Sequence, residues 1–420
     1  MAPSLPPRSE SILDSIRSSC RALTARSDIT VALLSLSSLS RLRTQLITPR
    51  IPQIDDEAID TFLHGIGAGS QHLQNNHRGL RLPLRFDSAH EELNLIAVLS
   101  LLNFLSGYRK PLHRLTQRGA FSNILSLVLA AHLSAGDSSS SSLLSAKGMR
   151  NATLTQISSM AQIQTHQEKP HPTLGPVVKV GMKDDDAFEI LELIVRVLNR
   201  TGEVLKKEGK EDLGHWVQQA LLEVEGDSEQ MLRKIYDTFP DFQDAYTIDG
   251  GCGFRFLVHL KSFAGETLTP FRPLTPAAVY ILKKALYLLN AITLRFSASG
   301  SPDHAPTFPL PTNTTRFPIF ADNVIPSVLM HHRIIVLSTS RTLRNPPLLS
   351  TEEATRLRAA SISACHRIVE RAQVLSENGS ENEWMRGMLE VDLDGYLWDS
   401  GKRESGKNVV RIAERGTTMY

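Results

Sequence analysis

The sequence predicts a mainly α-helical fold in a single domain that spans residues 1–420. Apolar residues recur every three or four positions along most of the chain, which is the spacing of one buried helix face. Alternating runs typical of half-buried strands are few, and aromatic residues make up only 6% of the composition. Neither an internal repeat nor a change of composition divides the chain.

The apolar spacing predicts helices, in chain order, over residues 93–104, 121–133, 190–198, 213–224, 228–237, 277–296, 324–332 and 352–374. The last of these has its own start signal, because Ser350 is a suitable N-cap and Glu353 follows three residues later. Short strands are expected at 176–180, 247–248 and 333–337. Serine-rich or proline-rich composition predicts inserted loops at about 137–142, 168–176 and 297–318.

The charge balance argues against a protein that binds long nucleic acid mainly by neutralising phosphates. The chain has 46 Lys and Arg against 44 Asp and Glu, a net charge of +2. It has no apolar run of about 18 residues, which a membrane-spanning helix needs. Its three cysteines, Cys20, Cys252 and Cys365, are spaced too widely for a disulfide framework or a cysteine-based zinc site. We therefore expect a protein of the cytoplasm or nucleus, without a membrane or stable nucleic-acid partner.

Several familiar motifs begin in this sequence and then fail. Residues 65–69 contain three glycines at alternate positions, but no buried strand precedes them as a dinucleotide-binding turn requires. His90 opens the first half of a zinc-protease helix, but Asn94 stands where the second ligand belongs. His331 and His332 are adjacent, so their rings diverge on a helix. Spacing alone therefore predicts neither a cofactor nor a metal site.

Two segments of the C-terminal half place carboxylates among apolar residues. Asp322 interrupts the apolar run 317–326, just before the predicted helix 324–332. It is either an N-cap, which contributes about 1 kcal/mol, or a functional carboxylate. Residues 391–399 combine three acids with Tyr396 and Trp398, a mixture that is costly to bury without a polar ligand. The alternative for that segment is an exposed acidic turn.

Eight short segments match a known family in the same order along the chain. They are PPRSES (6–11), LSLLNFLSGYR (99–109), LNRTGEVL (198–205), FPDFQDA (239–245), LKKALYLLNAI (282–292), FPIFADNVIPSVLMH (317–331), RLRAASISAC (356–365) and LDGYLWD (393–399). Through them the sequence resembles the queuosine 5′-phosphate N-glycosylases/hydrolases, the queuosine salvage proteins, and most of all their fungal branch. The resemblance implies a helical fold related to helical DNA glycosylases.

The implied activity is hydrolysis of the N-glycosidic bond of queuosine 5′-phosphate, which releases queuine for salvage into tRNA. The implied partners are these two small molecules, and no cofactor or metal is implied. The aspartate of the family's Phe-Ala-Asp motif falls on Asp322, as the nucleophile or as the stabiliser of an oxocarbenium-like transition state. The flanking Phe320 and Asn323 are expected to contact the substrate.

The family's base-holding segment falls on Asp394, Tyr396 and Asp399. Many relatives have a tyrosine where this chain has Gly395, so a contact made by that side chain is missing here or is supplied from elsewhere. The family's N-terminal histidine is assigned to His64. His72 and His77 are close enough in sequence to be alternatives.

The substrate's phosphate requires a cation or a helix N-terminus. We assign this contact to Lys283, with Lys284 and Arg109 as alternatives, although both lysines could instead lie on a solvated helix face. Asn103 is expected to be buried, either bonded within the fold or facing the pocket. Two other functions remain open, a non-catalytic queuine-binding module on the same fold and a DNA glycosylase. The lack of a basic surplus disfavours the second.

Overall fold

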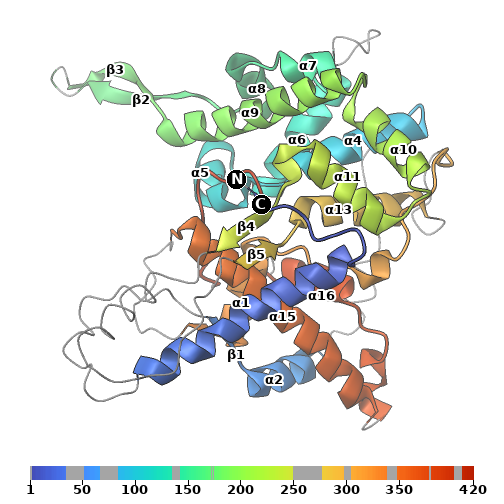
Figure 1. Ribbon diagram of the computed structural model, residues 1–420. Coiled ribbons are helices and arrows are strands. Elements are labelled where there is room, and N and C mark those ends of the chain that lie inside the picture. The colour runs from blue at the N-terminus through green and yellow to red at the C-terminus, as the bar shows by residue number, and fades with distance from the viewer. Residues whose placement is uncertain are drawn as a thin grey trace, which may run out of the picture. The chain divides into compact units, whose positions relative to one another are not determined.

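The computed structural model describes residues 2–34, 52–66, 84–134, 142–171, 173, 175–248, 277–297, 304–337, 348–377, 380–401 and 409–420. The described chain is mainly α-helical with a few short antiparallel strands, as the sequence predicts (Figure 1). It divides into two compact units. Unit 1 is Met1–His77, Asp244–Leu282 and Thr315–Ile412, and unit 2 is Arg78–Gln243, Lys283–Thr314 and Ala413–Tyr420. That both units form one domain stays a prediction.

Unit 1 is organised around its longest helix, α15 (Thr351–Ser376). The capping box expected at its start is present, because Glu353 N donates to Ser350 Oγ at 3.3 Å and Ser350 N donates to the Glu353 carboxylate at 3.0 Å. In Figure 1, α1 packs across α15. The other helices packed on α15 are α2 (Asp56–Ile66), α14 (Val324–His331), α16 (Glu390–Ser400) and the 3-10 helix η8 (Ser380–Met385), while α1 is Ile12–Leu34.

Two short antiparallel ladders complete unit 1. Strand β1 (Pro52–Ile54) pairs with β6 (Ile335–Leu337), and β4 (Ala245–Ile248) pairs with β5 (Ala277–Tyr280). The helix predicted from residue 277 is therefore wrong in its first six residues, and α13 (Lys283–Phe296) begins only after them. The reason is the pairing with β4, a contact distant in sequence that apolar spacing does not reveal.

Unit 2 contains the remaining helices and one hairpin. Its helices are α4 (Ala89–Leu101), η3 (Leu105–Tyr108), α5 (Arg109–Thr116), α6 (Ala120–Leu133), α7 (Ala146–Arg150), α8 (Leu154–Ala161), α9 (Asp185–Lys207), α10 (Leu213–Glu223), α11 (Ser228–Thr238), η5 (Pro240–Phe242) and α13. Six of the predicted helices, at 93–104, 121–133, 190–198, 213–224, 228–237 and 352–374, correspond to α4, α6, α9, α10, α11 and α15. The helix predicted at 324–332 is α14.

The chain forms a hairpin where composition predicted a loop at 168–176. Strands β2 (His166–His171) and β3 (Gly175–Lys183) pair antiparallel and project from the start of α9 in Figure 1. Pro170 is tolerated because a sheet of two strands leaves each strand an open edge, and the register shifts directly after it. Of the other two predicted loops, 137–141 lies outside the described residues. The described end of the third, 304–318, contains the 3-10 turn η7 (Thr314–Arg316).

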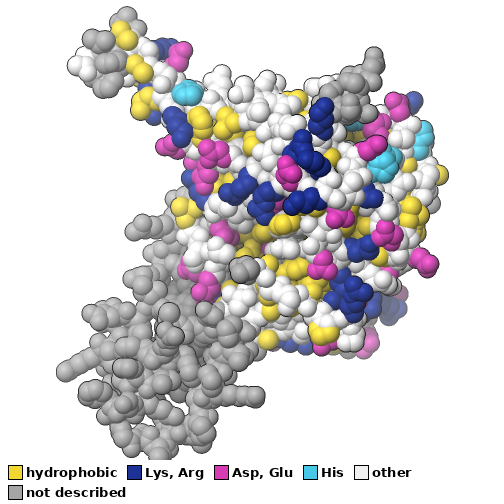
Figure 2. Space-filling model, turned by 45° about the horizontal axis from the view of Figure 1, so that its top comes forward, with side chains coloured by type: hydrophobic (Ala, Val, Ile, Leu, Met, Phe, Trp, Pro, Cys, Tyr) yellow, Lys and Arg dark blue, Asp and Glu magenta, His cyan; other side chains and the backbone are white. Residues whose placement is uncertain are grey.

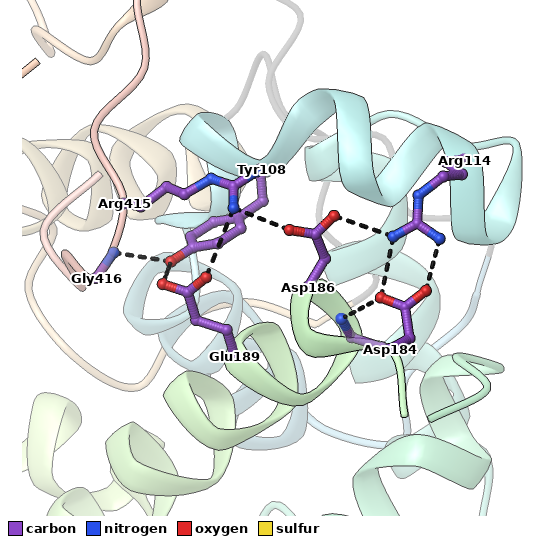
Figure 3. Close-up of polar contacts among 8 residues, drawn as sticks. Tyr108, Arg114, Asp184, Asp186, Glu189, Arg415 and Gly416 are labelled. Carbon is purple, nitrogen blue, oxygen red and sulfur yellow. Dashed lines mark hydrogen bonds and ion pairs between the residues drawn. The ribbon is translucent and has the colours of Figure 1, made fainter. Parts of the chain in front are cut away.

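A polar network joins the start of α9 to the C-terminal residues of unit 2 (Figure 3). Tyr108 Oη donates to Glu189 at 2.7 Å and accepts the backbone N–H of Gly416 at the same distance. Arg415 pairs with Asp186 at 2.9 Å. At the N-cap of α9, Asp184 accepts the N–H of Ala187 at 3.1 Å and pairs with Arg114 of α5 at 2.6 Å. These contacts fix the last residues of the chain within unit 2.

The described surface in Figure 2 carries basic and acidic side chains close to one another. This distribution agrees with the small net charge of +2. Within the described ranges, no helix combines the length and the apolar character that crossing a membrane requires.

The contact between α7 and α9 requires a glycine at position 202. A Cβ atom there would lie 2.3 Å from the backbone N of Arg150 and 2.7 Å from the carbonyl O of Ala146. In the preceding turn, Asn199 Nδ2 donates to the carbonyls of Met149, Arg150 and Ala152 at 2.9 to 3.1 Å. Both residues belong to the segment LNRTGEVL, which therefore closes the end of α7 against α9.

We predict that Gly202→Ala destabilises the protein by about 1–3 kcal/mol, because backbone atoms must move to admit the methyl group. This loss exceeds the roughly 0.5–1 kcal/mol that alanine gains over glycine inside a helix. Chemical denaturation followed by circular dichroism measures the effect. Gly181→Ala is the matched control, since nothing lies within 4 Å of a Cβ atom there. A Gly202→Ala protein as stable as the parent would contradict this packing.

Candidate active site

Asp322 lies at the start of α14 in unit 1 and is only 5% exposed. Its Oδ1 accepts the N–H groups of Val324 at 2.6 Å and Ile325 at 3.2 Å. Asp322 therefore caps the start of the helix, which was one of the two roles expected for it from the sequence. Among the described residues, however, these are its only hydrogen bonds, and Oδ2 has no partner there. The cap uses one carboxylate oxygen and leaves the other for a ligand.

The backbone directly before Asp322 is held by a buried ion pair. Arg358 of α15 donates to both carboxylate oxygens of Asp244, at 2.9 and 2.5 Å, and its Nε donates to the carbonyl of Ala321 at 2.8 Å. The two side chains are 1% and 0% exposed. A guanidinium can be buried when its donors are used in this way, since bidentate charge-assisted bonds offset its desolvation.

Asp244 is itself anchored, because its carbonyl accepts the N–H groups of Ile281 and Leu282 at 3.0 and 3.1 Å. The pair thus connects the start of β4, the end of β5 and the residue next to Asp322.

Sequence reasoning missed this pair, although both residues lie in matching segments. Arg358 shares one helical stripe with Ala354, Ser361 and Cys365, all of which are buried. A charged residue on a buried stripe of small residues needs an acidic partner, and this was the available signal. The identity of that partner, 114 positions earlier, is not encoded in local spacing.

Asn323 is anchored on the other side of Asp322. Its Nδ2 donates to the carbonyl of Ile412 at 2.8 Å, and its own carbonyl accepts Ser327 Oγ at 2.6 Å. Ser327 Oγ in turn accepts the N–H of Ile412 at 3.1 Å. The side-chain oxygen Oδ1 of Asn323 is buried and has no hydrogen-bond partner in the described part of the chain. Such an acceptor costs about 1–3 kcal/mol when left unpaired.

The structure brings the two predicted acidic segments together through Asp394 of α16. Its Oδ1 accepts the backbone N–H of Phe320 at 2.8 Å. Phe320 is only 6% exposed, whereas Trp398 is half-buried, so the tryptophan ring has the larger accessible face. Gly395 and Asp399 are also half-buried on this helix.

Tyr396 lies about 200° around α16 from Asp394 and contacts α2 instead. Its ring packs edge-on against Phe62, with centroids 6.2 Å apart, and Phe62 also packs against His332 at 5.1 Å. His64 lies two residues further on α2, exposed, with Nδ1 2.7 Å from the carbonyl of Asp60. It makes no hydrogen bond or ring contact with another predicted site residue within the described ranges. The alternatives His72 and His77 lie outside those ranges.

The predicted phosphate ligand, Lys283, lies in unit 2. Lys283 and Lys284 are 3% and 0% exposed, so the alternative of a solvated helix face is wrong for both. Lys283 Nζ donates to the carbonyl of Asn103 at 2.7 Å, and Lys284 Nζ donates to the carbonyls of Leu101 and Thr418 at 3.0 and 2.6 Å. Arg109 is exposed at the start of α5.

The two described cysteines are poor nucleophiles. Cys20 and Cys365 are both reduced and buried in unit 1. Burial raises the pKa of Cys20 to about 12 and raises that of Cys365 well above its ordinary value, because a thiolate loses its hydration. Only the thiolate attacks, so neither thiol reacts readily at neutral pH.

A cavity of about 500 Å³ lies elsewhere, in unit 2, between Ser158 and His166. Serine, threonine and glutamine side chains form most of its lining, which includes no carboxylate and none of the predicted site residues.

We predict that Asp244→Asn destabilises the protein by about 3–5 kcal/mol, because it leaves the buried charge of Arg358 unpaired. Asp56→Asn is the matched control. Asp56 of α2 pairs with Arg367, which like Arg358 belongs to α15, but both side chains of this pair are exposed. Loss of that surface pair should cost less than about 1 kcal/mol. Urea denaturation of both variants measures the difference. If both variants lose the same free energy of unfolding, burial of the Arg358–Asp244 pair does not increase the cost of breaking it.

The comparisons with known proteins bear on the same part of the chain. Residues 259–420 match a family model described as "Queuosine salvage protein". This range includes Asp322, Arg358 and Asp394 but not His64. No curated protein matches the chain. Over residues 259–420, less than half of its length, the chain is therefore similar to queuosine salvage proteins.

Proposed function

We propose that the protein is an N-glycosylase that hydrolyses queuosine 5′-phosphate and releases queuine, with Asp322 at the reacting sugar. The observation that carries this proposal is the state of the Asp322 carboxylate. It is buried, one oxygen is fixed by two backbone N–H groups, and the other has no partner among the described residues. The family match supports the choice of substrate class.

A carboxylate in this state suits the chemistry of a ribosyl C–N bond. Cleavage builds positive charge on C1′ and on the ring oxygen. At 4 Å, two opposite unit charges attract by about 1 kcal/mol in water and by about 4 kcal/mol near a protein surface. A fixed carboxylate also needs no reorganisation as the charge develops. Oδ2 of Asp322 is the atom that we place against C1′. It either stabilises the cation until water adds to C1′, or forms a bond to C1′ that water then hydrolyses. In both cases C1′ gains a hydroxyl group and the departing base gains a proton.

The leaving group sets a second requirement. Queuine is a 7-deazapurine, so the ring position that ordinary purine hydrolases protonate is a carbon. The departing base must be stabilised by hydrogen bonds along its guanine-like edge and at its cationic aminomethyl group. Asp394 and Asp399 have the acceptors for these donors, which resembles the paired carboxylates of glycosidases. Trp398, and less readily the buried Phe320, can stack on the base.

The remaining predicted residues are proposed as substrate contacts, each on its own evidence. Asn323 has an unpaired buried oxygen beside Asp322 that a substrate donor would satisfy. Tyr396, through Phe62, lies against the helix that carries His64. Gly395 offers no side chain, so we propose that neighbouring residues hold the base at this position. Lys283 is proposed as the phosphate contact because it supplies a compact positive charge.

We predict that Asp322→Asn lowers the rate of queuine release at least about 100-fold while the protein remains folded. Asparagine keeps the oxygen that accepts the N–H groups of Val324 and Ile325, and only the charge is lost. Asp322→Ala removes both, so it should also lose about 1 kcal/mol of stability. Chromatography of free queuine after incubation with queuosine 5′-phosphate measures the rate. Full turnover by Asp322→Asn would remove this residue from the mechanism.

The same assay separates the enzyme from a queuine-binding module. If the protein only binds queuine and its nucleotide, the unmodified protein will leave queuosine 5′-phosphate intact, while calorimetry will still detect binding.

We predict that Lys283→Ala raises KM for queuosine 5′-phosphate more than for the unphosphorylated nucleoside, because only the phosphate needs the ammonium charge. The ratio of kcat/KM for the two substrates measures this preference. Lys110→Ala is a suitable control, because this lysine is exposed and is not a candidate for the phosphate contact. Equal effects on both substrates would reject Lys283 as the phosphate ligand.

A further inference from the structure

Three side chains of types that commonly bind metal ions in proteins lie close together in unit 2, at the starts of α4 and α10. They are His90 of α4, Asp212 at the N-cap of α10, and His215 in the first turn of α10. One potential ligand atom from each lies within 4.8 Å of the other two. We propose that these residues, none of which the proposed active site uses, form a binding site for a divalent transition-metal ion of the zinc type.

The donor set fits this class of ion. Two imidazoles and one carboxylate, with water in the fourth position, form a common zinc site, and imidazole also suits copper and nickel. Metal–ligand bonds of about 2.0–2.1 Å place tetrahedral ligand atoms about 3.3 Å apart. His90 Nε2 and Asp212 Oδ2 are already 3.0 Å apart. The ring of His215 lies 4.7 Å from that of His90, and its side chain is 49% exposed and can turn toward the ion.

The hydrogen bonds of His90 direct the correct nitrogen toward Asp212. Its Nδ1 lies 3.3 Å from Gln218 Oε1, which can only accept, so Nδ1 carries the proton. The Gln218 amide is oriented in turn by Nε2, which donates to Thr307 Oγ1 at 3.0 Å. The lone pair of His90 Nε2 then faces a carboxylate oxygen. Two acceptors at this distance need a cation between them, which is either a second proton on the ring or a metal ion.

Asp212 divides its two oxygens between structure and the proposed site. Oδ1 caps α10 by accepting His215 N at 2.7 Å, and Oδ2 faces His90. An outer residue that fixes a histidine in this way typically changes metal affinity about 10–100-fold when it is lost. Gln218 is the residue that fixes His90 in this way here.

The helices that carry the ligands are held in close contact. Gly214 N donates to Asn94 Oδ1 at 3.0 Å, and a Cβ atom at 214 would lie 2.7 Å from Asn94 Cα. The ligands are therefore placed by two helices that cannot easily separate, which a metal site requires. A bound ion would link the start of α4 to the start of α10.

The test is calorimetric titration of the untagged, full-length protein with ZnCl₂, together with the visible absorption of the CoCl₂-loaded protein. We expect one site whose affinity falls more than about 100-fold in His90→Ala and in His215→Ala, since each removes a ligand. Gln218→Leu should weaken it about 10–100-fold. Asp212→Asn should weaken it while leaving the helix capped, because asparagine caps as well as aspartate. His113→Ala, an exposed histidine of α5, is the matched control and should change nothing.

Two results would overturn the proposal. One is absence of zinc binding by the unmodified protein up to about 1 mM, which leaves His90 paired with Asp212 through a proton. The other is binding whose affinity is the same in His90→Ala and His215→Ala as in the parent, which would place the ion on other histidines. Neither result depends on queuine release.

Discussion

The buried guanidinium of Arg358 is the interaction on which the geometry around Asp322 depends. It holds the Asp244 carboxylate with two bonds and the Ala321 carbonyl with a third. Its partners come from segments that are distant in sequence, and burying the charge is unfavourable unless all of them are in place. The conformation of the segment before α14 is therefore coupled to the formation of the β4–β5 ladder and to the position of α15.

Several carboxylates of this protein combine a structural and a chemical capacity. Asp322 and Asp212 each use one oxygen to cap a helix and present the other elsewhere, and Asp394 uses one oxygen to hold the backbone of Phe320. Such a residue can therefore be a helix cap and a functional carboxylate at the same time. A cap that fixes one oxygen also fixes the direction of the second, which is the preorganisation that a reacting group or a metal ligand needs.

Local pattern predicted many of the helices because their buried faces recur at the helical period, but it did not predict α1, α5, α7, α8 or α16. The bounds of α6, α10, α11 and α15 differ from the predicted ones by one or two residues. The differences at 277–280 and 168–176 arise where strands pair, since the partner of a strand is not visible in its own sequence. The same limit applies to the site. Acids in apolar runs identified Asp322 and Asp394, but the Arg358–Asp244 pair and the burial of both lysines depend on contacts between separate segments.

The connectivity of unit 1 has a consequence for how the protein is made. The last of its three stretches ends at Ile412, whose carbonyl accepts the side chain of Asn323, 89 residues earlier. The ribosome therefore delivers the segment around Asp322 well before the residues that anchor it. A prematurely terminated polypeptide lacks this acceptor, and one that stops before Asp394 also lacks the acceptor for Phe320. Both anchoring hydrogen bonds can therefore form only after the chain has been synthesised through Ile412.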